Sequence, residues 1–208
     1  MNYKSYSQAS QDHFILTLTQ GKRNGTFVEI GSNDPIGINN TYVLEKEFGW
    51  RGIMVEYDAK YLESYKTHRP NSFHIISDAT KIDYRKAFAD ANLPNNIDFL
   101  QIDLEVENKS TLNTLIKLDT EVMDNHKFAT VTFEHDIYRG DFFNTRQASR
   151  DIFQRRGYIR LFSDVKNMKN AFEDWYVHPD LVDSTLLARI TPQEGLEHSE
   201  VRNILKSL

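Results

Sequence analysis

Five acidic residues, each at or just beyond the end of an apolar run, are the first candidates for ligand binding or catalysis. They are Glu29, Glu56, Asp78, Asp103 and Glu134. Carboxylates accept hydrogen bonds from hydroxyl groups and ammonium groups. An acidic residue can also cap the helix that follows a strand, and both interpretations stay open for any one of the five. Their recurrence in series favours a shared ligand site.

The motif Thr-Phe-Glu-His-Asp, residues 132–136, places a histidine between two acids. His135 is a candidate general base, because an unperturbed histidine titrates near neutral pH. Glu134 or Asp136 can orient its ring. A surface histidine at a strand end is the alternative. We predict that His135, Glu134 and Asp136 are catalytic.

The elements that must position these residues alternate along the chain. Apolar runs at 26–30, 52–56, 73–77, 97–103 and 128–134 are typical of strands, and the segments between them repeat apolar residues at helical spacing. This alternation predicts βαβ units in an α/β, Rossmann-like, mainly parallel doubly wound sheet. The carboxyl ends of its strands share one edge, so the acids should converge there.

The chain after residue 156 predicts a different arrangement. A strand at 157–162, an aromatic loop at 173–182 and a strand at 184–190 suggest an antiparallel hairpin at the sheet edge. In the loop, Trp175 and Tyr176 either stack on a sugar ring or pack in the core. We expect a single domain over 1–208, with a Rossmann-like core at 25–190 and a short amphipathic helix within 191–208.

Two further segments have open interpretations. Residues 1–24 are an N-terminal cap or a lid over a ligand, with Gln8, Gln11 and Asp12 as its polar side chains. Arg146 and Arg150 lie four residues apart on one helical face, preceded by Arg139. This face is either solvated or binds an anionic acceptor.

Composition narrows the function classes. The formal charge of −5 gives no general attraction to nucleic acid or to an anionic membrane, so we expect neither as a partner. No cysteine is present, which excludes disulfides, thiolate metal sites and a cysteine nucleophile. The first residues lack the apolar run of a signal peptide, and no stretch is apolar enough to span a bilayer, so we predict a cytoplasmic protein.

The turn after the first strand reads Gly31-Ser32-Asn33-Asp34. It lacks the glycine fingerprint of dinucleotide-binding folds, and the chain also lacks a phosphate-binding G-K-[ST] loop. A ligand with ribose hydroxyls, a cationic amino-acid end and no phosphate suits carboxylates around a glycine turn, and S-adenosylmethionine has these features. Glu56 can accept from the ribose, Asp78 and Ala79 can face the adenine amino group, and Glu29 and Asp103 can hold the ammonium group. The predicted cofactor-binding residues are Glu29, Gly31, Ser32, Asn33, Asp34, Glu56, Tyr57, Asp78, Ala79 and Asp103.

The segments SYSQASQDHF, FVEIGSNDPIGINNTYVLEKEFGWRGIMVEYD, SDAT and IDFLQIDLEVE cover residues 5 to about 107. In these segments the chain resembles the FkbM-type methyltransferases, a branch of the class I S-adenosylmethionine-dependent fold. The resemblance implies methyl transfer to a hydroxyl oxygen, often on a sugar or a polyketide. The family usually has Lys and Gly where this chain has Gln101 and Val106, whereas Asp103 and Glu105 match its motif.

The resulting hypothesis is an S-adenosylmethionine-dependent O-methyltransferase that acts on a hydroxyl of a sugar or related small molecule. One alternative is a non-catalytic module that kept the cofactor-binding fold. A nucleotide-sugar epimerase is a weaker alternative, because neither the dinucleotide fingerprint nor a Tyr-x-x-x-Lys pair is evident. The oxygen-rich group Asp103, Glu105 and Glu134 also suggests a divalent cation such as Mg or Mn.

Overall fold

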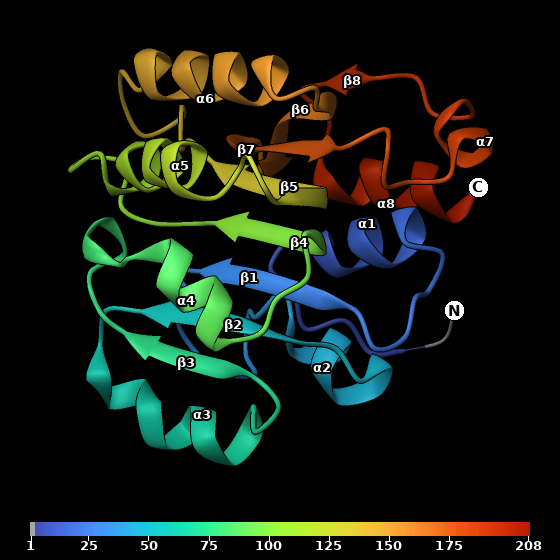
Figure 1. Ribbon diagram of the computed structural model, residues 1–208. Coiled ribbons are helices and arrows are strands. Elements are labelled where there is room, and N and C mark those ends of the chain that lie inside the picture. Colours follow the sequence, from blue (N-terminus) through green and yellow to red (C-terminus); the bar gives the residue numbers. More distant parts are fainter. Residues whose placement is uncertain (1–2) are drawn as a thin grey trace.

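The computed structural model describes residues 3–208, which form one eight-stranded sheet with helices on both faces (Figure 1). The strand order is β3-β2-β1-β4-β5-β7-β6-β8. The strands are β1 (Thr26–Ile30), β2 (Arg51–Glu56), β3 (Phe73–Ile76), β4 (Asn96–Ile102), β5 (Lys127–Glu134), β6 (Ile159–Asn167), β7 (Asn170–Val177) and β8 (Gln193–Glu194). The helices are α1 (Gln11–Leu18), α2 (Tyr42–Phe48), α3 (Leu62–His68), α4 (Tyr84–Asp90), α5 (Ser110–Glu121), α6 (Phe143–Arg155), α7 (Ser184–Leu187) and α8 (His198–Lys206).

The first five strands are parallel, and β7 runs antiparallel to both β5 and β6. This arrangement confirms the predicted α/β Rossmann-like fold with an antiparallel edge region. The strand order reverses between β1 and β4, because the chain builds outward from β1 to β3 and then returns to the other side of β1. Ligands of such sheets bind at this switch point, beyond the carboxyl ends of the strands.

Each face of the sheet has its own apolar core. On one face, Phe14 of α1, Leu44 of α2 and Val201 of α8 belong to a cluster that includes Trp50 and Trp175. On the other face, residues of α4, α5 and α6 pack with Phe128 and Phe133 of β5, and Figure 1 shows these three helices together on one side. The sheet is therefore buried on both faces, which explains why its strands read as near-continuous apolar runs.

The predicted hairpin exists, but its second strand was misplaced. β6 pairs with β7, which begins at Asn170, whereas the predicted strand at 184–190 contains the short helix α7. The two residues of the turn, Met168 and Lys169, have φ angles of 51° and 70°. Two-residue hairpin turns favour positive φ and usually contain glycine or Asn-Gly. This turn has neither, so its sequence lacks the usual hairpin signal.

The first half of the aromatic segment predicted as a loop, residues 173–177, lies in β7. Trp175 and Tyr176 are 0% and 1% exposed, and they pack on opposite faces of the sheet in the two apolar cores. Of the two interpretations, the structure therefore supports core packing. Among the helices of residues 3–208, none has both the length and the apolar character needed to cross a membrane.

Candidate functional site

The turn after β1 passes very close to the end of β4. Gly31 has a φ of +86°, and a Cβ atom on it would lie 1.7 Å from the carbonyl oxygen of Asp103. The amides of Gly31 and Ser32 both donate to the Val55 carbonyl at 3.0 Å. Only glycine permits both this φ angle and this close approach. The turn leaves an open space above the switch point between β1 and β4.

Glu56, at the end of β2, has its carboxylate fixed by backbone amides. One oxygen accepts from Asn33 N at 2.8 Å, and the other accepts from Tyr57 N and Asp58 N at 2.8 and 2.9 Å. Each carboxylate oxygen has two lone pairs, so Oε2, which accepts from one amide, can accept one further hydrogen bond from a ligand. The amides tie the turn after β1 to the turn after β2.

Glu29 is buried beneath this turn, with 1% of its surface exposed. Its Oε2 accepts from the Asn39 side chain at 3.2 Å, and Arg69 lies 3.9 Å from the same oxygen. Burial raises the pKa of Glu29, although Arg69 and the hydrogen bonds oppose that effect. Within residues 3–208, Glu29 Oε1 has no hydrogen-bond partner.

Three polar residues near Glu29 were not predicted as site residues: Asn39, Asn40 and Arg69. Arg69 is fully buried and donates to Glu45, Asn39 and Thr41. Asn40 donates to Gln101 at 2.7 Å, and its own Oδ1 has no partner within the described residues. The adjacent Asn39-Asn40-Thr41 run was the available signal, because consecutive short polar residues before a helix often bond to neighbouring backbone.

A second group of acids lies at the ends of β4 and β5. Ile102 and Phe133 are register partners, so Asp103 and Glu134 follow side by side. Burial and the nearby Asp103 raise the pKa of Glu134 well above its usual range, and burial also raises the pKa of Asp103. Two carboxyl groups this close hold one proton between them. Asp136 follows, with its Oδ2 accepting from Arg139 at 2.9 Å.

His135 points away from these acids. It is 0% exposed, and its Nε2 lies 3.3 Å from Asp164 of β6 and 3.5 Å from Asp174 of β7. Burial lowers the pKa of His135, but the two carboxylates outweigh it and raise the pKa overall. Ile137 N also donates to Nδ1, which favours the neutral ring, but this hydrogen bond is long at 3.3 Å. Two carboxylates outweigh one long hydrogen bond, so we take the ring as charged.

Arg146 and Arg150 of α6 complete the surroundings of His135. Arg146 donates to both oxygens of Asp164, and Arg150 bridges Asp164 and Asp174. Burial would raise the pKa of each acid, but His135 and Arg150 hold both pKa values well below the usual range. Both arginines are thus engaged in an internal ion network, which is neither of the two roles considered for them.

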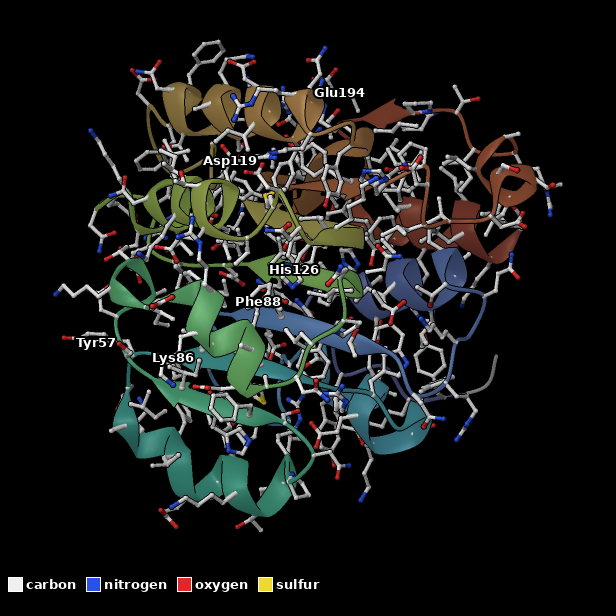
Figure 2. All side chains as sticks on the ribbon, viewed as in Figure 1. Tyr57, Lys86, Phe88, Asp119, His126 and Glu194 are labelled. Atoms are coloured by element: carbon white, nitrogen blue, oxygen red, sulfur yellow. The ribbon has the colours of Figure 1, made fainter. Side chains whose placement is uncertain are left out.

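A cleft of about 900 Å³ joins the two groups of acids across the carboxyl ends of β1 to β5. All ten predicted cofactor-binding residues line it, together with Glu105, Glu134 and Asp136. Figure 2 shows the Tyr57 side chain projecting at this edge of the molecule. His135 is not among the lining residues. Gln8 reaches the cleft from the N-terminal segment, whereas Gln11 and Asp12 are buried in α1 and Met1 and Asn2 lie outside the described residues.

The structure does not assemble the predicted metal ligands. Among the described residues, the one group of three whose ligand atoms lie within 4.8 Å of one another is His135, Asp164 and Asp174. Asp103, Glu105 and Glu134 do not form such a group, because Glu105 is exposed beyond the end of β4. The carboxylates near His135 already have Arg146 and Arg150 as cationic partners. That group therefore suits an ion network better than a metal ion.

Comparison with known proteins identifies the fold. No protein-family model matches the chain, and no curated protein matches its sequence. A TehB-like SAM-dependent methyltransferase from Corynebacterium glutamicum superposes with a TM-score of 0.52 at 10% identity, over 81% of this chain and 87% of that chain. A putative rRNA-methylase from Clostridium thermocellum also gives 0.52, at 15% identity, over 85% and 97%. The chain shares their fold, and neither match supports the FkbM subtype.

Proposed function

We propose that this protein is an S-adenosylmethionine-dependent methyltransferase of the FkbM type, which methylates a hydroxyl group of a sugar or related small molecule. The observation that carries the proposal is the Gly31 turn, which lies among Glu29, Glu56 and Asp103 at the switch point of the sheet. The fold shared with known methyltransferases supports it.

The residues present fit this cofactor. Glu56, fixed by three backbone amides, would accept a hydrogen bond from a ribose hydroxyl through Oε2. Ala79, which also lines the cleft, would lie against the adenine together with Asp78. The unsatisfied Oε1 of Glu29 would accept from the ammonium group. When bound, the cofactor supplies an electrophilic methyl group, so the protein has to orient the acceptor and remove its proton.

Asp136 is the best candidate for removing that proton. His135 does not line the cleft, and its ring is held by Asp164 and Asp174, so we do not retain it as the base. Glu134 shares a proton with Asp103. Asp136 lines the cleft, and Arg139 engages only its Oδ2, which leaves Oδ1 to accept a proton.

A divalent cation is not part of the proposal. The predicted ligands Asp103, Glu105 and Glu134 are not gathered around one point, and the compact group at His135 is neutralised by arginines. Oxygen-rich ligation of Mg or Mn needs several converging oxygens with room for an ion.

Calorimetry with S-adenosylmethionine and S-adenosylhomocysteine tests the proposal. We expect binding by the intact protein, and Glu56→Ala should weaken it by about 1–3 kcal/mol through the loss of a charge-assisted hydrogen bond. Glu63→Ala is the control, because Glu63 is an exposed acid on α3 outside the cleft. Undetectable binding at millimolar cofactor would overturn the proposal. Binding without turnover of any hydroxyl acceptor would favour the non-catalytic module.

A further inference from the structure

The acids that line the cleft fall into two groups: those that accept hydrogen bonds from backbone amides and those that do not. On the β2 and β3 side, Asp34, Glu56, Asp58 and Asp78 each accept hydrogen bonds from backbone amides. These hydrogen bonds explain the presence of the acids without a ligand, since a carboxylate that accepts backbone N–H groups is stabilised in its charged form.

The acids on the β4 and β5 side lack such support. Among the described residues, neither backbone amides nor lysines or arginines pair with Asp103, Glu105 or Glu134. The one arginine that lines the cleft, Arg139, pairs instead with Asp136 and Glu107. Asp103 and Glu134 reduce their mutual repulsion by sharing a proton. This half of the cleft therefore has a deficit of positive charge.

The sheet register places further acceptor groups beneath these acids. Glu29, Gln101 and Thr132 are consecutive register partners on β1, β4 and β5, so their side chains share one face. Asp103 and Glu134 follow two residues later on the same face, and Glu134 is the register partner of Glu173 on β7. Glu173 is 1% exposed, and burial with the charge of Asp103 raises its pKa to about 8.

Two buried oxygen atoms that line the same cleft independently indicate a ligand. Glu29 is 1% exposed and Asn40 is 3% exposed, yet Glu29 Oε1 and Asn40 Oδ1 accept no hydrogen bond within residues 3–208. A buried acceptor without a donor costs free energy until a ligand or water supplies one. Both atoms therefore favour a ligand rich in donors.

One ammonium group cannot satisfy all of these acceptors. It carries three donors, and the ammonium of the proposed cofactor would be used by Glu29 and Asn40. Asp103 and Glu134, which lie side by side and line the cleft, then remain without a cationic partner among the described residues. We propose that the methyl acceptor is itself cationic, an amino sugar or other small amine whose protonated nitrogen is held by Asp103 and Glu134 at the ends of β4 and β5.

This inference rests on the proposed function and adds the charge class of the acceptor. Neutral sugars would leave the carboxylates without a cation, and anionic acceptors would meet like charges at close range. The same repulsion disfavours a nucleic-acid acceptor, in which every nucleotide carries a phosphate. A bound ammonium would replace the shared proton of Asp103 and Glu134 and allow both groups to ionise.

Calorimetry on the protein saturated with S-adenosylhomocysteine tests the inference with three matched probes. Glucosamine is cationic, glucose is neutral and glucuronate is anionic. We expect glucosamine to bind about tenfold or more tightly than glucose, and glucuronate to bind least, because charge complementarity fixes the order. Glu134→Gln should remove most of the preference for glucosamine over glucose. Asp58→Asn, which removes a carboxylate at the other end of the cleft, should keep the preference.

The outcomes separate the two proposals. Failure to bind S-adenosylhomocysteine would overturn the proposed function itself. Normal cofactor binding with glucosamine no tighter than glucose would overturn only the cationic acceptor, as would an unchanged preference in folded Glu134→Gln. If Glu134→Gln fails to fold, as judged by urea denaturation, the three probes on the wild-type protein decide the inference alone.

Discussion

At the level of single residues, Gly31 allows the turn after β1 to pass close to the end of β4 at the edge of the cleft. Its positive φ lets the turn after β1 close over the Asp103 carbonyl, where any side chain would collide with main-chain atoms. The backbone at Asp103 is also held by its amide, which donates to the Ile30 carbonyl at 3.0 Å. Neither chain segment can therefore move away without breaking a hydrogen bond between β1 and β4.

We predict that Gly31→Ala lowers the free energy of unfolding by about 2–4 kcal/mol, because it adds left-handed strain to a steric overlap. Urea denaturation measures the change. The matched control is Gly37→Ala in the same loop, where the added Cβ would meet only the Asp34 side chain at 3.5 Å. Equal midpoints for the two variants would contradict the steric argument.

Asp136 is the residue on which the proposed chemistry depends. Asp136→Asn should leave S-adenosylhomocysteine affinity nearly unchanged and lower methyl transfer about a hundredfold or more, the range expected on removing a general base. The measurement is the rate of S-adenosylhomocysteine release with an acceptor that supports turnover.

Asp141→Asn, an exposed acid in the same loop, serves as the control for Asp136→Asn and should turn over at the wild-type rate. A wild-type rate for Asp136→Asn would exclude Asp136 as the base and redirect attention to the carboxyl pair of Asp103 and Glu134.

At the level of elements, the network around His135 joins the end of β5 to β6, β7 and α6. Each of these elements contributes a charged group: His135, Asp164, Asp174 and the arginines of α6. The amides of His135 and Asp136 also both donate to the Phe172 carbonyl of β7, at 2.7 and 3.1 Å. The network thereby fixes the strand end that presents Glu134 and Asp136 to the cleft.

We predict that His135→Gln lowers the free energy of unfolding by about 3 kcal/mol near pH 6, because it removes one partner from buried ion pairs. The pKa of His135 is raised in the folded state, so its stabilising contribution is complete below about pH 6.5 and is lost as the pH rises through the folded pKa. The difference between wild type and variant should therefore shrink toward about pH 9 in urea denaturation.

His178→Gln is the control for this pH dependence, because the pKa shift of His178 is opposite in sign to that of His135. Burial and Lys127 lower the pKa of His178, so folding favours the neutral ring, and its contribution grows as the pH rises from the folded pKa toward about 6.5 and is complete above that. Parallel pH profiles for His135→Gln and His178→Gln would contradict the assignment of a charged His135.

At the level of the whole molecule, a protein with a net charge of −5 concentrates much of its acidity in one cleft. The buried ion network lies outside that cleft, under α6. The acids of the cleft are therefore available to a ligand, and those of the network are committed to arginine and histidine. This separation argues for ligand binding without a metal ion.

We accordingly predict that exhaustive chelation leaves both the melting temperature and the affinity for S-adenosylhomocysteine unchanged, and that added magnesium or manganese restores nothing. Thermal unfolding and calorimetry before and after chelation provide the measurement. A loss of several degrees on chelation, recovered with manganese, would reveal a structural ion, since a ligand that binds only the folded state stabilises it.

The sequence by itself determined the five parallel strands and the meeting of their acidic ends, because strand runs and helical spacing are local patterns and parallel strands share one carboxyl edge. The cleft accordingly contains all ten predicted cofactor-binding residues. The tertiary structure alone decided which way side chains point. Glu134 faces the cleft while His135, one residue later, turns to Asp164 and Asp174, residues 29 and 39 positions away in the chain and contributed by strands β6 and β7. The hairpin through Met168 and Lys169, formed without glycine, brings those acids together, and no local pattern encodes that contact.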